Sequence, residues 1–181
     1  MEELIHIKDK SFVPYISEQE IMDRVASLGA QLNQEYADKS PLMIVVLNGA
    51  FVFAADLARE LTVNPEIQFI RISTYGDSMT SSKDAQLLLG LEVETEGKDV
   101  IIIEDIVETG FTVQYLIDNI RSHNPSSIKL VTLLFKPEKF EGGHKPDFVG
   151  FEIPSDFVVG YGLDYAQQGR ELKALYQLKA D

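Results

Sequence analysis

The chain has 181 residues, of which 45% are hydrophobic and 25% are charged, and its formal net charge is −13. This size and composition are typical of one soluble globular domain, so we expect a single domain over residues 1–181. The absence of cysteine excludes disulfides and thiolate metal sites and favours a reducing compartment. The negative charge argues against a general nucleic-acid binder. The sequence has no signal peptide and no apolar run of about 18 residues, so we expect a cytoplasmic protein without a membrane partner.

The pattern of apolar residues predicts helices that alternate with strands. Ser17 and Glu20 match a capping box, and apolar residues follow at helical spacing as far as Tyr36. The next predicted elements are a strand at 42–48, a helix at 51–61, strands at 67–73 and 99–105, a helix at 111–123, and strands at 128–135, 147–153 and 157–162. Residues 84–93 read as a further strand or hairpin arm. This alternation predicts an α/β fold with a doubly wound, mostly parallel sheet.

Polar or small residues stand where several of these strands end. They are Asn48 with Gly49, Ser73 with Thr74, Glu104 with Asp105, and Lys136. In parallel sheets of this class, ligands bind at the carboxyl ends of the strands. The sequence therefore predicts a binding site that these residues share.

The stretch VIIIEDIVETGFT, residues 100–112, combines an acid pair with a turn of small residues. Thr109, Gly110 and Thr112 stand at a predicted helix start, where free backbone N–H groups and the helix dipole bind anions. Glu104 and Asp105 are unsuited to phosphate, but they could accept hydrogen bonds from sugar hydroxyls or hold Mg²⁺. The stretch therefore predicts a site for a phosphorylated sugar.

Three other phosphate-handling classes lack their marks in this sequence. It has no GxxxxGK[ST], which disfavours a P-loop kinase, and no GxGxxG after the first strand, which disfavours a dinucleotide fold. A receiver domain would carry an acid pair after its first strand, and LMIVVLNGA has none.

The stretch IIIEDIVETGFT resembles the signature with which type I phosphoribosyltransferases bind phosphoribosyl pyrophosphate (PRPP). Further segments resemble the hypoxanthine (guanine) phosphoribosyltransferases, and the likeness runs from about residue 42 to residue 170. These segments are VVLNGAFVFAADLA, STYGDSMTSS, LLFKP and KPDFVGFEIPSDFVVGYGLDY. The resemblance implies a type I phosphoribosyltransferase fold, with a mostly parallel central sheet flanked by helices and a small hood from the terminal segments. It also implies purine salvage by a homodimer or homotetramer, with Mg²⁺-dependent transfer of the 5-phosphoribosyl group to hypoxanthine and guanine.

The resemblance assigns roles on the PRPP side of the site. Glu104 and Asp105 would face the ribose hydroxyls and Mg²⁺, and Asp164 would hold a Mg²⁺ that also binds pyrophosphate. Asn48 and Gly49 would form a loop with a non-proline cis peptide whose N–H groups face pyrophosphate, although a simple tight turn is an alternative. The remaining PRPP residues that it implies are Arg170 for pyrophosphate and Glu108, Thr109, Gly110, Phe111 and Thr112 for the 5′-phosphate.

The resemblance also assigns the purine site and the reaction centre. Lys136 would donate to the purine 6-oxo group, and Phe157 would stack on the ring, although a strand-end lysine is usually solvated and a phenylalanine usually core. The Val158 backbone and Asp164 would complete the base site. Glu108 would act as the acid/base at purine nitrogen 7. The small, polar segment at 74–84 would be a lid in which Thr74 and Tyr75 cover the reaction centre.

This chain departs from the usual family residues at several positions. The family usually has Asp at Glu108, and commonly Lys at Asn48 and Phe111 and Arg at Phe140, where Lys139 could substitute. His6, His123 and His144 share no metal-ligand spacing and are interpreted as surface or structural residues. A regulator that kept the fold to bind RNA or DNA is the alternative from another class, and the acidic composition argues against it.

Overall fold

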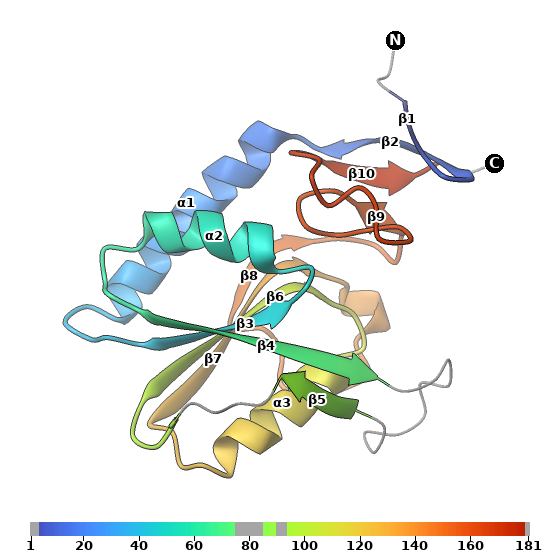
Figure 1. Cartoon of the computed structure of the whole chain (residues 1–181). Helices are drawn as coiled ribbons and strands as arrows, with labels where there is room; N and C mark the ends of the chain where they lie inside the picture. Colours follow the sequence, from blue (N-terminus) through green and yellow to red (C-terminus); the bar gives the residue numbers. More distant parts are fainter. Residues whose placement is uncertain (1–3, 75–84, 90–93, 180–181) are drawn as a thin grey trace.

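The central sheet has six strands in the order β5-β4-β3-β6-β7-β8 (Figure 1). The computed structural model describes residues 4–74, 85–89 and 94–179. Five strands are parallel, and β5 pairs antiparallel with β4. The strand bounds are β3 Leu42–Leu47, β4 Glu66–Thr74, β5 Ala85–Leu89, β6 Asp99–Val107, β7 Ser127–Phe135 and β8 Phe148–Glu152. The predicted mostly parallel α/β sheet is confirmed.

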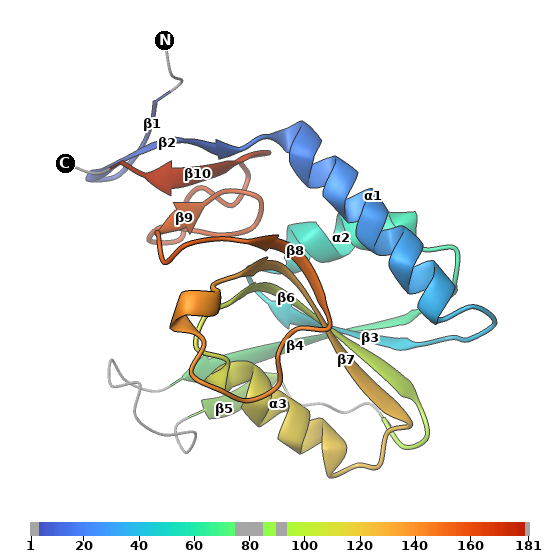
Figure 2. The same cartoon turned by 180° about the vertical axis from the view of Figure 1, so that it is seen from behind.

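Helices cover both faces of this sheet (Figures 1 and 2). Helices α1 (Glu18–Glu35) and α2 (Phe51–Glu60) pack on one face, and α3 (Phe111–Arg121) packs on the other. The side chains of β3 alternate between these two cores, which explains why the strand reads as an uninterrupted apolar run. Helix α1 begins after Ser17 with both capping-box hydrogen bonds. Of the helices described, none is long and apolar enough to cross a membrane.

The two ends of the chain join in a second, antiparallel sheet, which forms the hood above the central sheet (Figure 1). Its order is β1-β2-β10-β9, with bounds β1 Ile5–Ile7, β2 Lys10–Ile16, β9 Val158–Val159 and β10 Leu175–Leu178. The family resemblance implied this hood. The residue pattern did not predict β1, β2 or β10, because β1 and β10 are short and β2 contains Pro14.

Strand β6 is longer than predicted. It continues to Val107, because Ile106 and Val107 still pair with Leu134 and Phe135 of β7. The acid pair therefore lies within the last part of the strand rather than at its very end. The predicted strand at 157–162 is also shortened to β9, and the residues that follow β9 form a turn.

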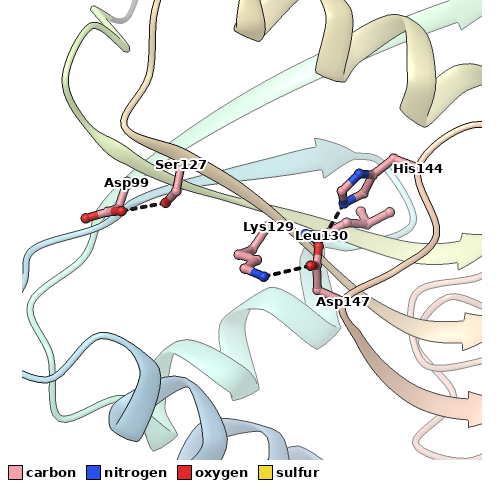
Figure 3. A network of polar contacts seen from close by, with 6 residues as sticks. All are labelled: Asp99, Ser127, Lys129, Leu130, His144 and Asp147. Carbon is pink, nitrogen blue, oxygen red and sulfur yellow. Dashed lines mark hydrogen bonds and ion pairs between the residues drawn. The ribbon is translucent and has the colours of Figure 1, made fainter.

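Polar contacts connect segments at the amino ends of β6 and β7, at the edge of the sheet opposite the carboxyl ends of the parallel strands (Figure 3). Asp147 accepts hydrogen bonds from Lys129, from His144 and from a backbone N–H group of β7, each at 2.9 Å. Ser127 donates to Asp99 across the first residues of the two strands at 2.5 Å. Burial acts to raise the pKa of Asp147, but these hydrogen bonds together lower it below its ordinary value. His144 is therefore structural, as predicted.

Candidate active site

A cavity of about 210 Å³ opens where the carboxyl ends of β6 and β7 face the segment around β9. The residues that line it are Asp105, Ile106, Glu108, Lys136, Phe157, Val158, Leu163 and Asp164. All but Ile106 and Leu163 were predicted as site residues from the sequence. Those two are apolar residues next to functional ones, and nothing in the sequence distinguishes them from core residues. The structure thus brings together acids, a lysine and an aromatic ring from three separate segments.

The acid pair lies in a buried position that disfavours the charged form of both carboxyls. Glu104 is buried. Its burial, and to a smaller extent the charge of Asp105, raise the pKa of Glu104 well above the ordinary value. Burial also raises the pKa of Asp105 to about 6, although the N–H of Ile106 donates to its carboxylate at 2.8 Å. Among the described residues, no lysine or arginine forms an ion pair with either acid. Burying charge in this way is costly unless a bound cation or donor offsets it.

The turn before α3 presents uncapped backbone N–H groups. Gly110 is the N-cap residue, with φ 88° and no side-chain cap hydrogen bond. A side chain at this position would overlap the Phe140 ring and the Gly142 carbonyl oxygen, so glycine is required. The first-turn N–H groups of an 11-residue helix are left for an anion, and Thr109 and Thr112 flank them in half-buried positions.

Lys136 and Glu108 form an ion pair inside the cavity. Lys136 is only 2% exposed, which excludes a solvated strand end. Lys139 approaches the other carboxylate oxygen of Glu108 at 3.6 Å. Phe157 is 45% exposed, so it is not a core residue. A buried ammonium and an accessible ring therefore line the same cavity.

The loop after β3 lies against both Asp105 and the turn after β9. A cis peptide bond joins Leu47 to Asn48, as the resemblance implied for this loop, and residues 48–50 form a tight turn into α2. A side chain at Gly49 would overlap the Asp105 carboxylate, and one at Gly162 would overlap the Gly49 carbonyl oxygen. These two glycines therefore allow three backbone segments to meet.

Asp164 and Arg170 form an ion pair at 2.6 Å. Arg170 also donates to the Gly162 carbonyl at 2.7 Å, and Asp164 accepts from the Gln167 N–H at 2.7 Å. The residues predicted for Mg²⁺ and for pyrophosphate are thus adjacent. Thr74 is the last residue of β4, whereas Tyr75 and the rest of the segment predicted as a lid lie outside the described residues.

Comparison with known proteins places this site in a family. The phosphoribosyl transferase domain matches residues 15–166. The chain is 47% identical to the hypoxanthine-guanine phosphoribosyltransferase of Bacillus subtilis over 91% of each chain. It is 42% identical to the hypoxanthine phosphoribosyltransferase of Escherichia coli over 87% of this chain and 89% of that one. A hypoxanthine-guanine phosphoribosyltransferase structure from Bacillus anthracis matches with a TM-score of 0.87 and 37% identity, and the match covers 95% of this chain and 99% of that one. The chain belongs to the hypoxanthine phosphoribosyltransferases.

Of the residues that depart from the family pattern expected from the sequence, Phe111 and Phe140 lie around the turn before α3. Phe111 is 42% exposed in the first position of the helix. Phe140 packs its ring against Gly110 and, at 5.5 Å between centroids, against Phe135. An aromatic contact therefore supports the turn at the position where the resemblance led us to expect arginine.

Proposed function

We propose that the chain transfers the 5-phosphoribosyl group from PRPP to hypoxanthine and guanine in a Mg²⁺-dependent reaction that yields IMP or GMP and pyrophosphate. One observation carries this proposal: the same cavity is lined by Asp105 of β6, by the buried Lys136 and by the exposed ring of Phe157. These groups suit a sugar, a 6-oxo group and a flat base, respectively.

On the donor side, the turn from Glu108 to Thr112 would hold the 5′-phosphate through backbone N–H groups and threonine hydroxyls. Glu104 and Asp105 would accept hydrogen bonds from the ribose hydroxyls. The Arg170 guanidinium would bind pyrophosphate, together with the backbone N–H groups of Asn48 and Gly49. Apart from Arg170, these residues lie at the carboxyl ends of the adjacent strands β3 and β6, so one extended, anionic substrate would touch all of them.

The acids also fit a magnesium ion. Glu104 and Asp105 offer oxygen ligands that form no ion pair among the described residues, and Asp164 offers another beside Arg170. Within the described part of the chain, no group of three or more acidic, histidine or cysteine side chains could hold a metal alone. This suits Mg²⁺, which is commonly held by one or two carboxylates plus substrate phosphates. When bound, Mg²⁺ would neutralise charge on the departing pyrophosphate.

On the acceptor side, Phe157 would stack on the purine and the Val158 backbone would contact its edge. The Lys136 ammonium has only donors, so it would bind a 6-oxo group and reject a 6-amino group. The cavity of about 210 Å³ is smaller than the roughly 300–1,000 Å³ of sites for drug-sized ligands.

The reaction replaces the bond between C1′ and pyrophosphate with a bond from C1′ to purine nitrogen 9. The protein residues would hold the two reactants in line and exclude water, which accounts for most of the rate. The Glu108 carboxylate would accept the proton that purine nitrogen 7 loses as the bond to nitrogen 9 forms. Thr74 and Tyr75 would cover the reaction centre as part of a lid.

We also propose that the chain works in the cytoplasm as a homodimer or homotetramer. Apolar side chains are exposed on β4 and at the start of α2, namely those of Ile67, Phe69 and Phe51, and such groups favour burial in an interface. Light scattering after size exclusion would measure the assembly, and a monomer at micromolar concentration would contradict this proposal.

The test of the proposed function is PRPP consumption with hypoxanthine, guanine, xanthine or adenine, each with Mg²⁺ and with EDTA. We expect turnover with hypoxanthine and guanine in Mg²⁺, little with adenine, and none in EDTA. Comparable turnover of adenine would contradict the role of Lys136. Lack of turnover with every base, together with retention of cellular RNA or DNA on a filter, would favour a nucleic-acid-binding regulator instead.

A further inference from the structure

The turn after β9 has three consecutive residues with positive φ: Gly160 at 103°, Tyr161 at 48° and Gly162 at 102°. A side chain at Gly160 would overlap the Ala174 carbonyl oxygen, and one at Gly162 would overlap a carbonyl oxygen of the loop after β3. Tyr161 is therefore the one residue of the three that carries a side chain, in a backbone region that non-glycine residues seldom adopt. Contacts elsewhere must hold it there.

The Tyr161 side chain supplies those contacts. The residue is 4% exposed, and its ring belongs to the core beneath α1 and α2. Its hydroxyl donates to the Asp56 carboxylate on α2 at 2.7 Å, and its backbone N–H donates to the Leu172 carbonyl at 2.8 Å. Arg59 lies 3.7 Å from the other Asp56 oxygen. The turn is thus fastened to α2 by a charge-assisted hydrogen bond, which is stronger than a neutral one.

Helix α2 also fixes the loop after β3, because it begins directly after residues 48–50. The backbone of Gly162 lies against the Gly49 carbonyl, and Gly49 in turn lies against the Asp105 carboxylate. Arg170 donates to the carbonyl of Gly162. The hydrogen bond on α2 therefore sets the spacing between the backbone around Gly49 and the segment that carries Asp164 and Arg170.

We propose that the hydrogen bond between Tyr161 and Asp56 positions the pyrophosphate and Mg²⁺ half of the site. Neither side chain lines the cavity, so both act through the backbone that they hold. The inference rests on the proposed function and deepens it, because it assigns to this bond the affinity for PRPP and not for the base. Loss of the bond would let the turn shift relative to Gly49 while the strand ends that carry Lys136 and Glu108 stay in place.

The chain provides a matched control a few residues away. The Tyr165 hydroxyl donates to Asp9 at 2.9 Å, which is the same type of bond on the hood side of the same segment. Tyr165→Phe removes this hydroxyl and keeps the ring that contacts Phe157. Tyr161→Phe and Tyr165→Phe therefore delete one hydroxyl each, and only the first bond reaches α2.

The experiment measures kcat, the KM for PRPP, the KM for hypoxanthine and the melting temperature for the parent, Tyr161→Phe, Asp56→Asn and Tyr165→Phe. We expect Tyr161→Phe and Asp56→Asn to raise the KM for PRPP by about five- to tenfold, and the double variant by no more than the larger single effect. The KM for hypoxanthine should stay within about twofold, and Tyr165→Phe should leave both constants near those of the parent.

A purely structural role predicts another pattern. If Tyr161→Phe lowers the melting temperature but leaves the KM for PRPP within about twofold of the parent, the proposal is overturned. Calorimetric titration with Mg²⁺ and pyrophosphate, in the absence of a base, gives a readout that does not need turnover. If the parent consumes no PRPP, the proposed function fails. The positioning role then stands or falls on whether Tyr161→Phe weakens this titration more than Tyr165→Phe does.

Discussion

The ammonium of Lys136 and the carboxylate of Glu108 form an ion pair just after the carboxyl ends of the adjacent strands β6 and β7. The exposed fractions of the two side chains differ greatly. The Lys136 side chain is 3% exposed, whereas that of Glu108 is 39% exposed. A buried ammonium without a partner is costly, so Glu108 neutralises Lys136 in the free protein in addition to any role at the purine. Lys136 has three N–H donors and can therefore hold Glu108 and a 6-oxo group together.

Substitution of Glu108 should therefore affect both rate and stability. Glu108→Gln keeps the length of the side chain but cannot exchange a proton, and it leaves Lys136 without its anion. We expect turnover to fall by at least about tenfold, because positioned acid/base groups contribute about 10²–10⁴-fold, and we expect the melting temperature to fall as well. Glu108→Asp, the usual residue of the family, should stay active.

Steady-state kinetics well below both melting temperatures separates these two effects. If Glu108→Gln loses stability while kcat at that temperature is unchanged, the carboxylate serves only Lys136, and the proton must leave through water. Lys139→Met is the control, because its ammonium lies 3.6 Å from Glu108 and its side chain is 40% exposed. Exposed pairs contribute little, so this variant should stay close to the parent.

Lys136 should decide between purines. In Lys136→Gln, an amide replaces the ammonium, and the amide presents an acceptor as well as donors. We expect the kcat/KM for hypoxanthine to fall by about 10²-fold or more, and the ratio of hypoxanthine to adenine to narrow, because a charged hydrogen bond is lost. Initial rates with both bases test this. An unchanged ratio would show that the backbone around Val158 makes the discrimination.

The ion pair between Lys136 and Glu108 is a contact that could not be predicted from the sequence. The buried strands were predictable because their apolar runs are uninterrupted. The two charged residues are 28 positions apart, and they meet because Val107 stands opposite Phe135 in the parallel register of β6 and β7. Adjacency and register are properties of the assembled sheet and leave no local pattern in the sequence.

Other misses have similar physical causes. Glu104 and Asp105 were interpreted as the end of a strand, since two adjacent charges seldom lie inside one, but pairing with β7 extends β6 past them. The positive φ of Tyr161 has no signal beyond its flanking glycines. The pyrophosphate-side residues were assigned by family resemblance, whereas the acid pair and the turn before α3 were predicted as a binding site from residue chemistry alone.

The Asp147 network should make stability depend on pH. The pKa of Asp147 is below its ordinary value, so its contribution is present above the unfolded pKa of about 3.9 and is lost as the pH falls through the folded pKa. Asp147→Asn should lower the free energy of unfolding by about 1–2 kcal/mol at pH 7 and by less as the pH falls below about 3.9. Urea unfolding at several pH values measures this. A difference that does not depend on pH would show that shape, not charge, matters at this position.

Asp164 should matter for magnesium. Asp164→Asn keeps the shape but removes the charge, so the Mg²⁺ concentration for half-maximal rate should rise by about tenfold or more while the fold is retained. The matched control is Asp118→Asn, because Asp118 also pairs with an arginine, at 3.2 Å, but lies on the exposed part of α3. Overlapping Mg²⁺ titrations for Asp164→Asn and the parent would assign to Asp164 only the task of holding Arg170.

Asp105 should lower the stability of the free protein at neutral pH, where its carboxylate is kept for ligand binding. Its pKa is raised from 3.8 to about 6 by burial, so the fold favours the protonated carboxyl. The associated stability is full below pH 3.8 and is lost as the pH rises through about 6. At pH 8, ionised Asp105 should therefore destabilise the free protein, and Asp105→Asn should remove this cost and relieve the repulsion on Glu104.

We therefore expect Asp105→Asn, in EDTA at pH 8, to unfold with a free energy about 1–3 kcal/mol higher than that of the parent, and the difference to vanish near pH 4. Glu104→Gln should act in the same direction, because its pKa is raised as well. Mg²⁺ with PRPP should reverse the order, since ligands stabilise the protein that binds them. Thermal unfolding under the four combinations of pH and ligand tests this. If Asp105→Asn is less stable than the parent in EDTA at pH 8, the carboxylate stabilises the fold itself. It is then not a destabilising group that the protein keeps to bind a metal or a sugar.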